Sequence, residues 1–183
     1  MALAPDRPVG GVLFDRDDTL VVDVPYNADP HLVVPVPGAH RAVERARAAG
    51  LRLGVVTNQS AIAKGLATRA QVDATNARVD ELVGPFDLWC VCPHDATDGC
   101  DCRKPRPGMV LRAAEVLGVP AAELVVVGDI GADVAAARAA GAQGILVPTP
   151  RTRQEEVDAA ETVAATLDDA VSLVLAQRSA PVA

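Results

Sequence analysis

Two aspartates, Asp15 and Asp17, follow an apolar stretch near the start of the chain, and together they could carry out phosphoryl transfer. A carboxylate nucleophile such as Asp15 can form an aspartyl-phosphate and so divide one displacement into two easier ones. A carboxyl group two residues further on is placed to protonate the leaving group and then to activate water. Asp15, the main-chain carbonyl of Asp17 and a distant carboxylate, Asp129, also offer the oxygen ligands that Mg²⁺ prefers. We therefore expect magnesium-dependent chemistry with Asp15 as the nucleophile.

Thr57 and Lys104 are the candidates for holding the transferred phosphoryl group. Thr57 offers a hydroxyl and a main-chain N–H at a predicted strand end, and Lys104 could place an ammonium against the developing negative charge. The chain has only one other lysine, Lys64. A solvated surface residue is the ordinary alternative for a single lysine. The position of Lys104 directly after a candidate metal site favours the catalytic interpretation.

That candidate metal site lies in a short segment that holds all four cysteines of the chain. Three sulfurs and one imidazole make a closed tetrahedral Zn²⁺ site, which is typical of a structural ion. The expected ligands are Cys92, His94, Cys100 and Cys102. Cys90 is left over, and strand geometry places it on the same side as Cys92, so it could compete as a ligand. Reduced, unligated cysteines are the alternative; a zinc ion would fix Arg103 and Lys104 in position.

Short apolar runs alternate with alanine-rich segments, which predicts repeated strand–helix units. The chain should form strands over residues 11–15, 51–57, 86–91, 123–128 and 144–148. Helices are expected over residues 38–50, 68–83, 108–118, 133–140 and 167–178. A loop with four prolines between the first strand and the first helix is too rich in proline to be helical.

This order predicts an α/β fold with a single doubly wound, mainly parallel sheet and helices on both faces. In such sheets ligands bind outside the carboxyl ends of the strands. The polar candidates lie at the ends of three different strands: Asp15 and Asp17 at the first, Thr57 and Asn58 at the second, and Asp129 at the fourth. Their convergence on one edge is better explained by a reaction site than by a solvated acidic turn.

The composition bounds the remaining possibilities. A length of 183 residues suits one domain, with residues 1–8 and 179–183 as flexible tails. The net charge of −7 argues against a nucleic-acid partner. The sequence has no apolar run of the ~20 residues needed to span a membrane, and we see no signal peptide, so a cytoplasmic protein is expected. Glycine motifs for nucleotides and partners for a serine triad are missing from the sequence.

Four segments also resemble a known enzyme family: residues 14–19, 57–65, 92–94 and 100–109, which read FDRDDT, TNQSAIAKG, CPH and CDCRKPRPGM. They are similar to those of the haloacid dehalogenase (HAD) superfamily over residues 10–174, and more narrowly to D-glycero-D-manno-heptose 1,7-bisphosphate phosphatases. Histidinol-phosphate phosphatases share the architecture and a similar zinc loop, and another small phosphomonoester also stays possible as substrate.

The resemblance implies hydrolysis of a small phosphorylated sugar at its 7-phosphate, with catalytic Mg²⁺ and structural Zn²⁺. It implies that Asp15, Asp17, Thr57 and Lys104 are catalytic and that Asp129 completes the magnesium site. The substrate would be contacted by Asp23, Tyr26, Thr57, Asn58, Gln59, Ser60, Arg103 and Lys104. Without a large cap domain, the proline-rich loop and the zinc loop would shape specificity, and a monomer is expected.

The chain departs from this family at three positions. Asp18 stands where the family usually has glycine, which adds charge and backbone stiffness beside the nucleophile. Ala61 replaces another common glycine, and Ile130 stands where many relatives carry a lysine that contacts the substrate.

A non-enzymatic alternative is a receiver-like signalling module that holds phosphate on an aspartate without turning it over. Such modules also combine acidic residues, threonine and lysine on a doubly wound sheet, but fold analogy alone does not decide function. The presence of Asp17, placed for acid and base catalysis, favours the enzyme.

Overall fold

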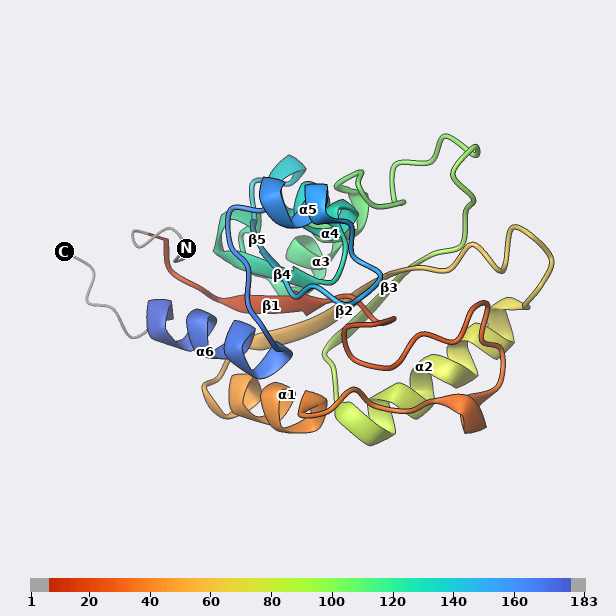
Figure 1. Cartoon of the computed structure of the whole chain (residues 1–183), viewed down its shortest axis with the longest axis horizontal. Coiled ribbons are helices and arrows are strands. Elements are labelled where there is room, and N and C mark those ends of the chain that lie inside the picture. The colour runs from red at the N-terminus through yellow and green to blue at the C-terminus, as the bar shows by residue number, and fades with distance from the viewer. Residues whose placement is uncertain (1–6, 179–183) are drawn as a thin grey trace.

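A sheet of five parallel strands forms the centre of the computed structural model, which describes residues 7–178 (Figure 1). The strands are β1 Gly11–Phe14, β2 Arg52–Asn58, β3 Leu88–Cys92, β4 Leu124–Gly128 and β5 Gln143–Leu146. Their order is β3-β2-β1-β4-β5. β1 and β4 are buried along their whole length, as expected of aliphatic strands covered on both faces.

Helices cover both faces of the sheet (Figure 1). One face packs against α1 Ala39–Ala48, α2 Arg69–Val83 and α6 Leu167–Arg178, and the other against α3 Gly108–Leu117 and α4 Gly131–Ala139. Each face has its own apolar core, because alternate residues of the strands point to opposite sides. The predicted doubly wound α/β fold is confirmed.

The predicted elements are all present, with ends that differ by at most two residues. β3 begins at Leu88 rather than Phe86, and the Phe86 N–H donates to the Asp80 side chain of α2 instead of to β2. α4 begins two residues before Asp133, whose carboxylate accepts a hydrogen bond from the Ile130 N–H and caps the first turn.

Three short helical elements were not predicted. α5 Gln154–Ala159 lies beside α4, where Glu156 accepts a hydrogen bond from the Gly131 N–H. Two single 3₁₀ turns occur at Pro30–Leu32 and Ala121–Glu123. The turn at Pro30–Leu32 lies inside the proline-rich loop. The expectation that this loop has no helical residues was therefore wrong for these three residues. Asp29 accepts from the His31 N–H and caps that turn.

The proline-rich loop runs from β1 to α1 and is tied back to its own start. The Val22 N–H donates to Val34 and the Val36 N–H to Leu20. Among the described residues, no helix is both long and apolar enough to cross a membrane. Most of the two predicted tails lies outside the described residues; Arg7, which is described, accepts a hydrogen bond from the Gln177 side chain.

Candidate active site and metal centres

Asp15 and Asp129 lie side by side at the ends of the neighbouring strands β1 and β4. Here the strand order changes direction, because the chain continues from β1 to one side of the sheet and later returns to the other. β1 leads outward to β2 and β3, whereas β4 and β5 lie on its other side. Phe14 is in register with Val127, and the Asp15 N–H donates to the Val127 carbonyl at 2.9 Å. Both residues are more than nine-tenths buried. This is the switch point at which open α/β sheets bind their ligands.

Lys104 reaches this point from the loop that precedes α3. Its ammonium lies 2.6 Å from Asp15 Oδ1 and 2.6 Å from Asp133 Oδ1, and it donates to the Val56 carbonyl at 2.8 Å. The lysine side chain is 2% exposed. Lys104 and Asp15 therefore meet in the structure, and three oxygens fix the ammonium in place.

Asp133 was not among the residues predicted for the site. Its side chain is fully buried and supplies the second carboxylate bound to Lys104. The available signal was its spacing: it follows Asp129 by four residues, so one turn of helix brings it back to the same edge. In the sequence that spacing is indistinguishable from an ordinary acidic residue in the first turn of α4.

Gly128, the last residue of β4, packs directly against Asp133. A Cβ atom added at this glycine would lie 2.2 Å from Cγ of Asp133. The missing side chain thus provides the space that the Asp133 carboxylate occupies.

The crowding of carboxylates perturbs their protonation. Burial, together with the nearby charges of Asp133 and Asp17, raises the pKa of Asp15 to about 7, although Lys104 acts in the opposite direction. Burial and the charges of Asp15 and Asp133 raise the pKa of Asp129 to about 8. Burial alone would lower the pKa of Lys104, but the Asp133 and Asp15 carboxylates raise it overall, so the ammonium stays charged.

These carboxylates fit a magnesium ion. Asp15, Asp129 and Asp133 each place one oxygen within 4.8 Å of the others. One ammonium cannot neutralise three ionised carboxylates, so a further cation would stabilise their charged forms. Hard oxygen ligands of this kind suit Mg²⁺.

Asp17 is held from two sides. Arg16 binds its carboxylate with two nitrogens, Nε to Oδ1 and Nη2 to Oδ2, both at 3.0 Å. Gln59 Nε2 donates to Asp17 Oδ2 and to Thr57 Oγ1, each at 2.8 Å. Asp17 and Thr57, predicted from separate strands, are thus joined through one amide.

The side chains of Asn58 and Gln59 face inward. Gln59 is 5% exposed, and its amide is engaged with Asp17 and Thr57 as described. Asn58 binds the main chain of Lys104: its Oδ1 accepts from the Lys104 N–H at 3.1 Å and its Nδ2 donates to the Lys104 carbonyl at 3.2 Å. The Asn58 contacts hold the loop that carries Lys104, and the assignment of both residues to the substrate stays a prediction.

The remaining residues predicted for the substrate lie on the surrounding loops. Tyr26 is half exposed and accepts a hydrogen bond from Lys64 at 3.0 Å. Arg103 donates to the His94 carbonyl at 3.1 Å, and the Ser60 carbonyl accepts from the Lys64 N–H. None of the hydrogen bonds of these three residues leads to Asp15.

The backbone conformation of Asp18 explains why a glycine would suit this position. Its φ of +53° lies in the left-handed region, which aspartate tolerates better than most side chains do. Its carboxylate accepts from the Asp23 N–H at 3.0 Å and lies 3.4 Å from Arg151, which also binds Asp23 at 2.5 Å. Arg151 in the loop after β5 therefore links that loop to the one after β1. Ile130, the N-cap residue of α4, is about one-third exposed.

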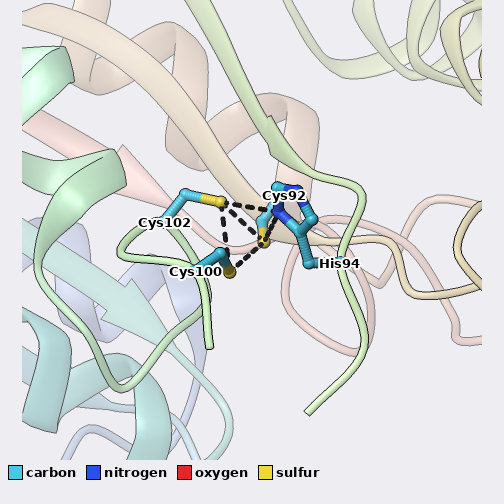
Figure 2. A group of neighbouring side chains, drawn as sticks. All are labelled: Cys92, His94, Cys100 and Cys102. Atoms are coloured by element: carbon cyan, nitrogen blue, oxygen red, sulfur yellow. Dashed lines mark hydrogen bonds between the residues drawn. The ribbon is translucent and has the colours of Figure 1, made fainter. Parts of the chain in front are cut away.

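The predicted zinc ligands converge on one point, as Figure 2 shows. The Cys102 sulfur lies 2.9 Å from that of Cys92, 3.5 Å from that of Cys100 and 3.2 Å from His94 Nδ1. Zn–S bonds of about 2.3 Å would place sulfurs about 3.8 Å apart at the corners of a tetrahedron, so the group needs only slight expansion to hold the ion. Cys90 is not part of this group.

The crowding of the sulfurs also perturbs the protonation of the thiols. Burial and the adjacent sulfurs of Cys92 and Cys100 raise the pKa of Cys102 to about 12. Burial likewise raises the pKa of Cys92. A zinc ion would relieve this cost, because it binds thiolates directly.

A large cavity of about 890 Å³ lies elsewhere, between α4, α5 and β5. None of the predicted catalytic residues lines it. The site at the carboxyl edge is thus identified by its convergent side chains rather than by an enclosed volume.

Comparisons with known proteins agree with this geometry. The model of the HAD-hydrolase-like family matches residues 101–171. The D-glycero-β-D-manno-heptose-1,7-bisphosphate 7-phosphatase of Pseudomonas aeruginosa is 39% identical over 147 residues, which cover 75% of this chain and 80% of that protein. The Vibrio cholerae enzyme of the same name is 37% identical over 164 residues, covering 83% and 88% of the two chains.

A solved structure extends the similarity to three dimensions. The D,D-heptose 1,7-bisphosphate phosphatase of Bordetella bronchiseptica, in complex with magnesium and phosphate, superposes with a TM-score of 0.79 at 28% identity. The match covers 91% of this chain and 99% of that one. The magnesium in that relative is consistent with the carboxylate group found here. The chain belongs to the D-glycero-D-manno-heptose 1,7-bisphosphate phosphatase family of HAD-like hydrolases.

Proposed function

We propose that this protein hydrolyses D-glycero-D-manno-heptose 1,7-bisphosphate at its 7-phosphate through an aspartyl-phosphate on Asp15. The observation that carries the proposal is the buried contact of Lys104 with Asp15 and Asp133, 2.6 Å each, beside Asp129 at the switch point. That constellation occurs in a chain whose relatives are named for this reaction.

In the first half of the reaction, an Asp15 oxygen attacks the phosphorus and the bond to the sugar oxygen breaks. Asp17 gives its proton to that oxygen, so the sugar leaves as an alcohol. Lys104, with its ammonium bound to Asp15, and Thr57, with its hydroxyl at the end of β2, would steady the charged phosphoryl oxygens.

In the second half, the Asp17 carboxylate takes a proton from water as the water oxygen attacks the phosphorus. The bond from phosphorus to Asp15 breaks, inorganic phosphate leaves, and both aspartates return to their starting states. Asp17 thus serves first as an acid and then as a base.

Asp15, Asp129 and the main-chain carbonyl of Asp17 would hold the magnesium ion, with Asp133 close enough to join them directly or through water. When bound, the ion would neutralise phosphoryl charge and orient the phosphate for in-line attack. The four residues Cys92, His94, Cys100 and Cys102 would hold a zinc ion with no open position, which stabilises the loop that carries Arg103 and Lys104.

The sugar and its second phosphate would be contacted by the exposed loops around the edge. Tyr26, Asp23, Ser60 and Arg103 occupy those loops, and Asn58 and Gln59 support them from beneath. A monomer would suffice, because one chain carries every residue named in the reaction.

Release of inorganic phosphate from a panel of esters tests the proposal. The panel holds heptose 1,7-bisphosphate in both anomers, histidinol phosphate and simple sugar monophosphates, each with Mg²⁺. The heptose bisphosphate should have the highest kcat/KM, the Asp15→Asn variant should be inactive, and phosphate should come only from C7. Preference for histidinol phosphate would overturn the substrate assignment, and full activity of Asp15→Asn would overturn the mechanism. A long-lived phosphoprotein without turnover would indicate the signalling module instead.

A further inference from the structure

Arg16, between the nucleophile and the acid/base in the sequence, is a buried cation that the reaction as described does not use. It is 2% exposed and is the largest side chain in the fully buried interior of the described residues. Two of its nitrogens bind the two oxygens of Asp17, both at 3.0 Å. Such a two-point contact between guanidinium and carboxylate fixes the carboxylate plane as well as its position.

The third nitrogen of Arg16 is anchored by a different part of the chain. Nη1 donates to Asn76 Oδ1 at 2.8 Å, and this contact is buried. Asn76 lies within α2, sixty residues away in the sequence, and is 5% exposed. The orientation of Arg16 is therefore set by a helix that contributes no residue to the proposed chemistry.

Gln59 completes the environment of the Asp17 carboxylate. Its Nε2 donates to Asp17 Oδ2 at 2.8 Å, so Oδ2 accepts two hydrogen bonds and Oδ1 accepts one. Each carboxylate oxygen has two lone-pair directions. Oδ1 thus keeps one direction unused, and Oδ1 is the oxygen left to carry the transferred proton.

We infer that Arg16, anchored by Asn76, is a positioning residue that aims Asp17 Oδ1 at the leaving oxygen of the substrate. The inference rests on the proposed function, since it assigns a role within that reaction. The proton moves from Asp17 Oδ1 to the sugar oxygen as the P–O bond breaks, and the resulting carboxylate stays bound to Arg16 until water returns a proton.

If Arg16 positions the general acid, its loss should slow only those substrates whose leaving group needs a proton. A sugar alkoxide is a poor leaving group, so its departure requires the proton from Asp17. p-Nitrophenolate is stable as an anion and leaves without one. General acid catalysis contributes on the order of 10² to 10⁴ in rate, and this contribution is available only to the sugar phosphate. A loss of the general fold would lower both activities together.

The experiment compares kcat/KM for heptose 1,7-bisphosphate and for p-nitrophenyl phosphate, with Mg²⁺, in the full chain. Asn76→Ala should lower the sugar phosphate value about 10-fold and Arg16→Met about 100-fold, within the range that a general acid supplies. Both variants should keep kcat/KM for p-nitrophenyl phosphate within about 2-fold, because this ratio covers the steps up to formation of the aspartyl-phosphate, and Asp17 acts as a base only after them. Asn76→Asp, which keeps an acceptor oxygen for Arg16, should restore the sugar phosphate value.

Val79→Ala is the matched control, because Val79 is a buried α2 residue in the apolar core whose side chain can make no hydrogen bond to Arg16 or Asp17. It should leave the ratio of the two activities unchanged even where it lowers thermal stability. Equal losses on both substrates in Asn76→Ala would overturn the inference. Failure of the unmodified protein to release phosphate from either ester would instead refute the proposed function. Should Arg16→Met not fold, the Asn76 pair decides the question alone.

Discussion

Asn58 and Lys104 exchange two hydrogen bonds, from main-chain N–H to Oδ1 at 3.1 Å and from Nδ2 to main-chain carbonyl at 3.2 Å. The end of β2 thereby holds the backbone of the loop that delivers the ammonium to Asp15. The placement of Lys104 is determined from two directions, by this amide and by the cysteine group two residues before it.

Removing that amide should impair turnover more than substrate affinity. In Asn58→Ala the Lys104 backbone loses both partners, and small displacements of catalytic groups are costly, so kcat should fall roughly 10- to 100-fold with little change in KM. Asn58→Asp keeps the acceptor and loses the donor, so its kcat should lie between that of the unmodified protein and that of Asn58→Ala. Steady-state kinetics on the sugar phosphate measures this. A raised KM with normal kcat would mean that Asn58 binds the sugar directly.

Neutralising Lys104 should cost both activity and stability. Lys104→Met leaves the buried Asp15 and Asp133 carboxylates without their cation, and breaking a buried pair in this way destabilises a protein by about 3 kcal/mol or more. Urea unfolding at pH 8 without added metal should show the loss. Addition of Mg²⁺ should recover part of the stability but not the activity. The surface variant Lys64→Met is the control, expected to unfold at nearly the same urea concentration as the unmodified protein.

The cysteine group should contain one zinc ion per chain. Cys102→Ser removes the sulfur that contacts the other three ligands and should abolish bound zinc, lower Tm and lower kcat. Cys90→Ser changes a cysteine outside the group and should keep both zinc and activity. Elemental analysis of the purified protein measures bound zinc, thermal unfolding measures Tm, and phosphate release measures kcat. Loss of zinc in Cys90→Ser, or full activity in zinc-free protein, would contradict the assignment.

Stabilisation by magnesium should grow with pH. The pKa of Asp15 is raised to about 7 and that of Asp129 to about 8, above the ordinary aspartate value near 4. Between about pH 4 and pH 8 the folded state therefore binds more protons than the unfolded state, and the metal-free protein loses stability as pH rises. Mg²⁺ binds the ionised carboxylates and offsets that loss.

Thermal unfolding with and without Mg²⁺ at pH 5.5 and pH 8 tests this dependence. The increase in Tm on adding Mg²⁺ should be several-fold larger at the higher pH. Asp129→Asn should remove most of the difference between the two pH values. An equal increase at both would show that the carboxylates are already ionised at pH 5.5.

The sequence allowed the fold and the catalytic edge to be predicted for a common reason. Apolar runs of strand length alternating with helices leave few possible topologies, and parallel strands bring their carboxyl ends to one edge. Asp15, Thr57 and Asp129 each follow such a run, so their proximity could be inferred before any side-chain position was known.

Side-chain direction could not be inferred in the same way. Asn58 ends β2 and Gln59 follows it, and nothing in the sequence indicated that their amides bind Lys104, Asp17 and Thr57. Asp133 looked like an ordinary first-turn residue until the fold placed it against Lys104. Strand ends specify where a residue lies, whereas its rotamer depends on partners from distant segments.

The contact between Gly128 and Asp133 bears on which sequences this site can accept. A single added methyl group at residue 128 would displace a carboxylate that holds the ammonium of Lys104, although the glycine takes part in no chemistry itself. In a library of random variants selected for activity, position 128 should therefore tolerate substitution as poorly as Asp15, the proposed nucleophile. Substitutions there would be rejected for the volume of the new side chain, whatever its polarity.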